Sequence, residues 1–554
     1  MKDLSREIRA YALKNALEFG KADAGRILPK LFQFGLAKEE IKEVMPIISS
    51  IVKEVNRLSE EERTVQFGEV KDLIKEREEK EKDLPDLSNL EGGVVTRIPP
   101  EPSKYLHIGH ALSFLINYLS ARRYGGKCFL RFEDANPEKV SQEYVDAMLE
   151  DLEEYLKIKP DGVRYVSDDL EGMYQSAEKL IGLGKVYVCF CERQKMQDLR
   201  HAGKECACRK AGSDKTLREW KNMLAGEYTE GQCVLRLSGN MQALNHIMRD
   251  PVLFRVVVAK HFRKGLKYKV WPMYDFYNPI EDHLMGVTHI LRTNEFDQRV
   301  ELQDLLKDLL GLRKQTIIQY GRIGVMEGTT KGREIRELVE SGEYLGWDDP
   351  RLVTLKALRR RGIRKEVLYE LAKKVGLSQR EIFIDFAMIA AISRKMIDAE
   401  TSRYYFVSDP VAVHVQNAPV LEQVHIPIHP DKDETRTIEV GDKVFVSGSD
   451  ISLFKGKEVR LLHLYNITLP SKIGKGEIEV RFTSIENKPL PKVQWVSRSV
   501  RVRVLMPDAK WKEGFGEIGL KDLSIGKVVQ FERFGFVKLD AKKDDILEFW
   551  FTHQ

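Results

Sequence analysis

The stretch that decides the fold is Arg97–Glu133, RIPPEPSKYLHIGHALSFLINYLSARRYGGKCFLRFE. An apolar strand over 93–98 leads into a proline-rich turn, and a helix opens at His107-Ile-Gly-His110. Two glycines then separate this helix from a second strand, CFLRFE. A strand, a helix and a strand in this order build a parallel sheet, which binds ligands at the carboxyl ends of its strands. The sequence therefore predicts a Rossmann-like domain with a ligand site at the start of this helix.

Two histidines mark that site. His107 and His110 stand three positions apart at a helix N-terminus, so they face the same way beside free backbone N–H groups and the positive end of the helix dipole. Such a place suits a phosphate. The alternative is that the two histidines are surface or capping residues, but the flanking glycines, prolines and strands favour the phosphate site.

Composition limits the class of protein. At 554 residues the chain is too long for one core, and its length predicts about three to five domains. Charged residues make up 32% of the chain at a net charge of +5, which allows nucleic acid as a partner without demanding it. No apolar run approaches the roughly 18 residues that span a bilayer, and the charged N-terminus is unlike a signal peptide. The few, clustered cysteines favour a reducing compartment, so we expect a cytoplasmic protein.

The pattern of apolar residues changes along the chain. We expect an N-terminal helical domain over 1–88, serving for docking or RNA contact, and a Rossmann-like catalytic domain in two parts. Strands and helices alternate in both parts, and KVYVCF (185–190) and KVWPMYDF (269–276) read as further strands. Period-two segments such as SVRVRVLM predict antiparallel strands near the C-terminus. The predicted boundaries are 1–88 (helical), 89–188 and 268–325 (catalytic), 189–267 (insertion), 326–405 (helical stem domain) and 406–554 (antiparallel β-barrels).

Four of the six cysteines lie in the insertion as two matched pairs, Cys189/Cys191 and Cys206/Cys208. Cysteines at positions i and i+2 can point at one ion, and two such pairs complete a tetrahedral thiolate set for Zn²⁺. A zinc ion held by all four thiolates would have no open coordination position, so its role would be structural. The alternative is that the four side chains are reduced cysteines buried as small hydrophobes.

Several motifs together resemble the class I aminoacyl-tRNA synthetases. PPEPSKYLHIGH (99–110) is similar to the HIGH signature of that class, and RFEDANP (131–137) and PMYDF (272–276) narrow the resemblance to its glutamyl/glutaminyl branch. GWDDPRL and LRRRGI add to it, and the β-rich C-terminus resembles the two barrels of glutaminyl enzymes and of archaeal and eukaryotic glutamyl enzymes. The resemblance covers about residues 89–554.

The resemblance implies ATP and Mg²⁺ at the HIGH motif and tRNA as the acceptor. His107 and His110 would contact the ATP phosphates and stabilise charge during attack on the α-phosphorus. Gly109 would let adenine approach the backbone. Residues 189–267 would bind the acceptor stem of tRNA and 406–554 its anticodon. The ATP site implied by the resemblance comprises Pro99, Pro100, His107, Gly109, His110, Lys331 and Arg333.

The second signature of the class, KMSKS, is degenerate here. By position it lies within 324–333, where Thr330-Lys-Gly-Arg333 is the best match. The chemistry needs a mobile cation in this loop, and Lys331 or Arg333 could supply it. Lys331 matches the family's lysine, so we expect it to act in catalysis.

The choice between glutamate and glutamine depends on the side-chain pocket. The family match puts Arg97, Glu133, Tyr274 and Asn278 there, and Glu133 would pair with the substrate's ammonium. Arg292 follows the strand VTHIL, and glutamyl enzymes resemble this chain in having arginine at that position. A guanidinium fits a carboxylate and sets donors against donors opposite an amide; the alternative is an arginine that merely caps a strand end.

Arg292 and the cysteine pairs together favour a glutamyl-tRNA synthetase that joins L-glutamate to tRNA(Glu). A non-discriminating variant would also charge tRNA(Gln). The alternatives are a glutaminyl-tRNA synthetase and a catalytically weak paralogue that binds RNA. The branch is usually monomeric, so we expect a monomer.

Overall fold

A computed structural model describes residues 4–74, 83–326, 328–441, 443–472 and 476–554. The chain divides into two compact units, Met1–Lys82 and Asp83–Gln554. Within the described residues, no helix is both long and apolar enough to cross a membrane. The run KDLIKEREEKEKD (71–83) is nearly all charged, which predicts a solvated helix or linker; its residues 75–82 lie outside the described residues.

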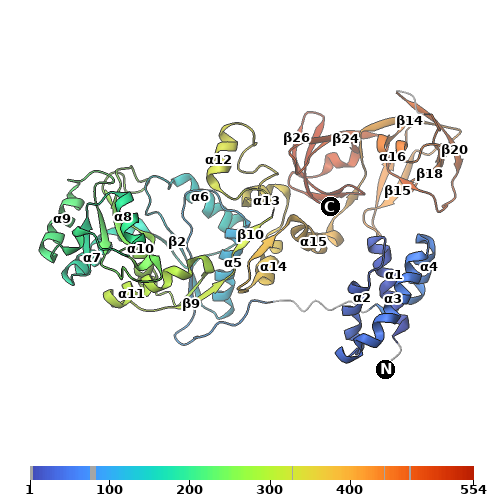
Figure 1. Ribbon diagram of the computed structural model, residues 1–554. Helices are drawn as coiled ribbons and strands as arrows, with labels where there is room; N and C mark the ends of the chain where they lie inside the picture. The colour runs from blue at the N-terminus through green and yellow to red at the C-terminus, as the bar shows by residue number, and fades with distance from the viewer. Residues whose placement is uncertain (1–3, 75–82, 327, 442, 473–475) are drawn as a thin grey trace. The chain divides into compact units, whose positions relative to one another are not determined.

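The N-terminal unit is helical, in blue in Figure 1. Apolar residues at helical spacing, among them Ile8, Val44 and Ile48, form its buried core. Ser59 and Glu62 form a capping box at the start of the fourth helix. Its α-helices are α1 (Ser5–Phe19), α2 (Ala24–Leu31), α3 (Ile41–Arg57) and α4 (Glu60–Val70), with short 3₁₀ turns at Phe32–Phe34, Lys38–Glu40 and Lys71–Leu73.

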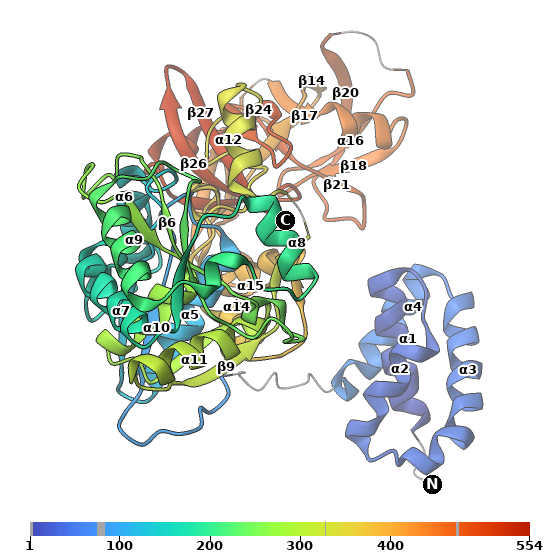
Figure 2. The ribbon, with the colours of Figure 1, turned by 60° about the vertical axis from the view of Figure 1, so that its left-hand side comes forward.

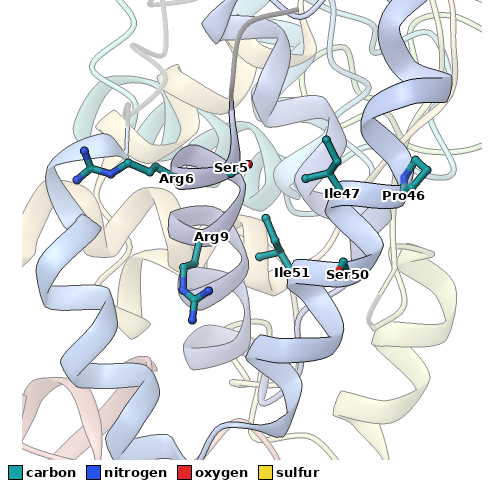
Figure 3. A pocket seen from close by; sticks show the side chains of 7 residues that line it. All are labelled: Ser5, Arg6, Arg9, Pro46, Ile47, Ser50 and Ile51. Carbon is teal, nitrogen blue, oxygen red and sulfur yellow. The ribbon is translucent and has the colours of Figure 1, made fainter.

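A groove of about 580 Å³ runs between α1 and α3. Figure 3 shows Ile47 and Ile51 of α3 extending toward α1, while Arg6 and Arg9 extend from α1 itself. Arg9 is held by Glu54 at 3.3 Å and Gln66 at 2.9 Å. The groove therefore joins an apolar wall to a basic one.

A parallel sheet carries the second unit's ligand site. Strands β1 (Val95–Ile98), β2 (Lys127–Phe132) and β3 (Val163–Tyr165) run parallel, as do β8 (His289–Thr293) and β9 (Thr316–Tyr320). The Thr288 N–H donates to the Val95 carbonyl at 2.9 Å, which brings β8 beside β1. The connecting helices are α5 (Ile108–Arg123), α6 (Gln142–Glu150) with a π-helical turn (Asp151–Tyr155), and α11 (Val300–Leu310). This confirms the predicted parallel α/β sheet.

A four-stranded antiparallel sheet interrupts the alternation. It comprises β4 (Val186–Cys189), β5 (Val234–Leu237), β6 (Val252–Val256) and β7 (Val270–Pro272), accompanied by α7 (Leu170–Gly182), α8 (Arg193–His201) and α9 (Ser213–Ala225). The placement of the strands at 185–190 and 269–276 in the catalytic alternation was therefore wrong. The second strand ends at Pro272, and α10 (Tyr274–Leu284) follows, because Tyr274 and Tyr277 recur at helical spacing.

Helices lie beyond the parallel sheet. Strands β10 (Ile323–Val325) and β11 (Ile382–Ile384) pair in parallel among α12 (Gly332–Glu340), α13 (Leu355–Arg361), α14 (Lys365–Val375) and α15 (Phe386–Ile397). Leu368 and Leu371 of α14 share the hydrophobic core of α5, so this region and the parallel sheet are packed together.

Two seven-stranded sheets complete the unit, in orange and red in Figures 1 and 2. One is ordered β12-β25-β26-β27-β23-β24-β13 and the other β21-β18-β19-β20-β14-β17-β22. Most neighbouring strands here are antiparallel, as predicted. The exceptions are four parallel pairs, β23 with β27, β14 with β20, β18 with β21 and β12 with β25. Strands that are distant in sequence meet here, and period-two patterning cannot reveal their direction.

The bounds of these elements are β12 (Arg403–Tyr404), β13 (Phe406–Ser408), β14 (Pro410–Gln416), β15 (Gln423–Pro427), β16 (Thr435–Glu439), β17 (Lys443–Ser447), α16 (Gly448–Leu453), β18 (Glu458–Leu461), β19 (Asn466–Thr468), β20 (Ile478–Ser484), β21 (Lys492–Val493), β22 (Trp495–Val496), β23 (Ser499–Leu505), β24 (Trp511–Glu517), β25 (Val528–Phe531), β26 (Gly535–Lys543) and β27 (Ile546–His553). Strands β15 and β16 form a separate antiparallel hairpin.

Candidate active site

The N-terminus of α5 is capped by the two histidines themselves. His107 Nδ1 accepts from the Gly109 N–H at 3.1 Å, and His110 Nδ1 accepts from the His107 N–H at 3.2 Å. A ring nitrogen that accepts carries no proton, so this network assigns each ring its proton on Nε2. Burial, reinforced by the Lys104 ammonium, lowers the pKa of His107 to about 3, and burial holds the pKa of His110 well below its usual value. The pair is therefore neutral at pH 7.

A cavity of about 710 Å³ opens beside this helix terminus. Three of the predicted site residues are not in its lining: Pro100, Asn278 and Arg333. The Pro100 carbonyl instead accepts from the Glu133 N–H at 2.9 Å. The predicted residues that line the cavity together are Arg97, Pro99, His107, Gly109, His110, Glu133, Tyr274, Arg292 and Lys331.

A buried ion-pair network forms one wall. Asp282 on α10 accepts from Arg97 Nε at 3.1 Å and from Arg131 at 2.7 Å, and Arg131 also pairs with Glu133 at 2.8 Å. Burial raises the pKa of the Glu133 carboxyl, and Arg131 opposes the shift. Asn278, with its amide oriented to satisfy both neighbours, accepts from Arg131 at 2.8 Å and donates to Asp282 at 3.2 Å. Asn278 thus supports the wall from behind.

Among the described residues that line the cavity, two arginines have buried donors without a partner. The buried Arg97 Nη1 has no hydrogen-bond partner in the described structure, and the same holds for Nε and Nη2 of Arg292. Arg292 is 5% exposed and donates its Nη1 to Gln303 at 3.0 Å. Gln303 in turn donates to Asp275 at 3.2 Å. Buried donors without a partner cost free energy, and a ligand carboxylate in the cavity would satisfy them.

The degenerate loop presents one cation to the cavity. Lys331 precedes α12, and its Nζ contacts Glu334 at 2.7 Å. Arg333 is 91% exposed and pairs with Glu337 at 2.9 Å on the helix surface. Of the two candidates for the family's lysine, only Lys331 lines the cavity.

The cysteine pairs converge on one point. The Sγ atoms of Cys189, Cys191, Cys206 and Cys208 all lie within 4.8 Å of one another. Two of the Sγ–Sγ distances are 3.8 and 4.0 Å, close to the edge of about 3.8 Å that a tetrahedron with Zn–S bonds of about 2.3 Å requires. The buried Arg236 Nη1 lies 3.7 Å from Cys189 Sγ, where it would offset thiolate charge. The four side chains fit a zinc ion.

Comparison with known proteins identifies the family. A model described as the catalytic domain of class I tRNA synthetases (E and Q) matches residues 93–399. The chain belongs to this synthetase family. Two models of the family's anti-codon binding domain match residues 401–485 and 492–540.

Full-length relatives agree with the assignment. The glutamate–tRNA ligase of Pyrococcus furiosus is 37% identical over 98% of both chains, and that of Korarchaeum cryptofilum is 38% identical over 100% of both. A solved glutamate-tRNA synthetase from Elizabethkingia anophelis covers 55% of this chain and 72% of its own at 18% identity and a TM-score of 0.37, a similarity too weak to bear on the assignment.

Sequence reasoning missed several residues of this synthetase's site. Arg131, Asp282, Gln303 and Asp275 hold the predicted pocket residues in place through buried contacts. Arg131 lies in the quoted motif RFEDANP and alternates with Glu133 along β2, which was a usable signal. Asp275 likewise lies in the quoted motif PMYDF, whereas Asp282 on α10 and Gln303 on α11 gave no such signal. Lys104, inside the HIGH stretch, also lines the cavity.

Proposed function

We propose that this synthetase is a glutamate–tRNA ligase. It would activate L-glutamate with ATP and Mg²⁺ to glutamyl-adenylate and transfer the acyl group to the 3′ end of tRNA(Glu). The observation that carries the choice of amino acid is Arg292, a buried guanidinium in the cavity lining with two unused donor nitrogens. The names of the full-length relatives support the same choice.

In the first step a carboxylate oxygen of glutamate attacks the α-phosphorus of ATP. The bond to the bridging oxygen breaks, and pyrophosphate leaves with the electron pair. His107 and His110 would donate their Nε2–H groups to phosphate oxygens as negative charge grows, beside the positive end of α5. Mg²⁺ would screen the phosphates. Neutral imidazoles suit this role because they donate without being titrated near pH 7.

The two ends of glutamate would meet different walls. Glu133 would pair with the substrate ammonium, and Arg292 with the side-chain carboxylate, aided by Arg97 Nη1 and the Tyr274 hydroxyl. Glutamine would set its amide N–H groups against guanidinium donors, which lowers its affinity. The glutaminyl alternative is therefore disfavoured.

The decisive test charges purified tRNA(Glu) and tRNA(Gln) separately with radiolabelled glutamate or glutamine. We expect glutamate on tRNA(Glu), and glutamate on tRNA(Gln) if the enzyme is non-discriminating. Glutamine attached at comparable kcat/KM would overturn the proposal. We further propose that 189–267 binds the acceptor stem and 406–554 the anticodon, that the enzyme is a monomer, and that it works in the cytoplasm.

We also propose a structural zinc ion at the four cysteines. When bound, Zn²⁺ would form a closed tetrahedral thiolate site that crosslinks 189–191 to 206–208. Protein purified without added metal should contain about one zinc per chain by mass spectrometry. Cys206→Ser should lower both the zinc content and the melting temperature.

The matched control for the zinc site is Cys233→Ser, because Cys233 is equally buried but lies outside the cluster. This variant should keep its zinc. Metal-free protein, with Cys206→Ser no less stable than Cys233→Ser, would instead favour four cysteines buried as small hydrophobes.

A further inference from the structure

Lys104 is a cavity residue within the stretch PPEPSKYLHIGH, three positions before His107. It lies in the turn between β1 and α5 and lines the cavity with His107 and Lys331. Its stem also supports the degenerate loop. A Cβ atom added at Gly332 would come 2.9 Å from Lys104 Cβ and 3.0 Å from its Cδ, so the loop backbone rests on the lysine's methylene groups. Lys104 therefore touches both signatures of the class.

The Lys104 ammonium is uncompensated. Within the described part of the chain, no carboxylate lies at ion-pair distance from it, and the nearest acidic influence is that of Glu101. Burial lowers the pKa of the Lys104 ammonium, and Glu101 opposes the shift. A cation that is partly removed from water and lacks a partner favours an anion beside it.

The other charges of the cavity show which anion this is. Arg97 is engaged by Asp282, Lys331 by Glu334 and Arg322, at 3.9 Å, by Glu295. Lys104 and Arg292 are thus the cavity's two cations without a carboxylate partner in the described residues. Under the proposed function, Arg292 binds the side-chain carboxylate of glutamate. The remaining anion, a triphosphate of about four negative charges facing two neutral histidines, is left for Lys104.

We propose that Lys104 binds the triphosphate of ATP and adds a second positive charge to the one that Lys331 supplies from the degenerate second signature. The inference rests on the proposed function for the identity of the nucleotide. As the α-phosphorus is attacked and the bond to the bridging oxygen breaks, the ammonium stabilises charge on the departing pyrophosphate. Because the loop at Gly332 packs on the same side chain, Lys104 also fixes where Lys331 approaches the phosphates.

The test compares the binding of Mg-ATP and adenosine by calorimetry. Lys104→Met keeps the methylene stem under Gly332 and removes the charge. We expect its dissociation constant for Mg-ATP to rise about tenfold to a hundredfold, the effect of losing one charge-assisted hydrogen bond. Adenosine, which has no phosphate, should bind as it does to the wild type. Lys104→Arg should recover most of the ATP affinity.

The matched control is Lys139→Met, since Lys139 is exposed on the same unit and does not line the cavity. Equal ATP affinity in Lys104→Met and wild type would overturn the inference, and so would an equal loss for adenosine, which would indicate packing alone. The proposed function fails separately: wild type and Lys139→Met would then form no glutamyl-tRNA, whatever the difference in ATP binding.

Discussion

Replacing Arg292 by alanine should lower kcat/KM for glutamate about a thousandfold, chiefly through KM. Truncating one partner of a buried charged pair costs about 4 kcal/mol, and that energy corresponds to about a thousandfold in affinity. The KM for ATP should change little, because the unused donors of Arg292 would bind the amino acid and not the nucleotide. Steady-state pyrophosphate exchange with each substrate varied in turn measures both constants.

The same substitution should stabilise the protein when no substrate is bound. Arg292 is a buried cation without a carboxylate partner in the described residues, so its removal should raise the melting temperature. Arg292→Lys keeps the positive charge but cannot make two parallel hydrogen bonds to a carboxylate. Its kcat/KM for glutamate should therefore lie between the values for the wild type and Arg292→Ala. Arg313→Ala removes an exposed arginine that does not line the cavity and serves as the control. Unchanged dependence on glutamate in Arg292→Ala would remove Arg292 from the pocket.

Replacing His110 by alanine should lower kcat about a hundredfold to a thousandfold, the usual effect of losing one preorganised donor to a developing charge. Substrate binding should change less, because the donor matters most as the α-phosphorus is attacked. The pKa of His107 is about 3 and that of His110 is also far below 7, so both rings stay neutral above their folded-state pKa. The rate ratio should therefore be the same at pH 6.5 and pH 8.

His110→Asn separates catalysis from capping. Asparagine can still accept from the His107 N–H, so the helix cap should survive while the Nε2–H donor is displaced. Its melting temperature should match that of His414→Ala, an exposed histidine on β14 that serves as the control. A rate ratio that changes steeply with pH near 6.5 would contradict neutral histidines.

The parts of the site that could be predicted are those carried by short motifs. His107, Gly109 and His110 are neighbours in sequence, and their geometry follows from one strand, one turn and one helix. Asp282 could not be found this way, because it meets Arg97 across 185 positions. Gln303 likewise acts only through Arg292 and Asp275, and nothing in its own surroundings indicates a site.

The fold likewise has parts that follow from local sequence and parts that depend on contacts between distant segments. Helix α3 was recognisable because one of its faces is apolar. Helix α5, which is buried on most sides, was recognisable from the turn before it and the two glycines after it. The boundary at Pro272–Tyr274 was not, because a short aromatic run fits a strand and the first turn of a helix equally well. The parallel pairs among the C-terminal strands depend on which distant strands meet, and that is settled by packing of the whole sheet.

Helix α13 determines how the protein can be dissected. Its seven residues lie between the HIGH turn and the last strand. At its first residue, the Leu355 N–H donates to the Leu106 carbonyl of the HIGH turn at 2.9 Å. At its last residue, the buried Arg361 donates to the Phe551 and Thr552 carbonyls of β27 at 3.2 and 3.1 Å. A fragment ending near residue 405 would leave that guanidinium without acceptors it now uses. Residues 83–554 are therefore best expressed as one piece, even where the family models divide them.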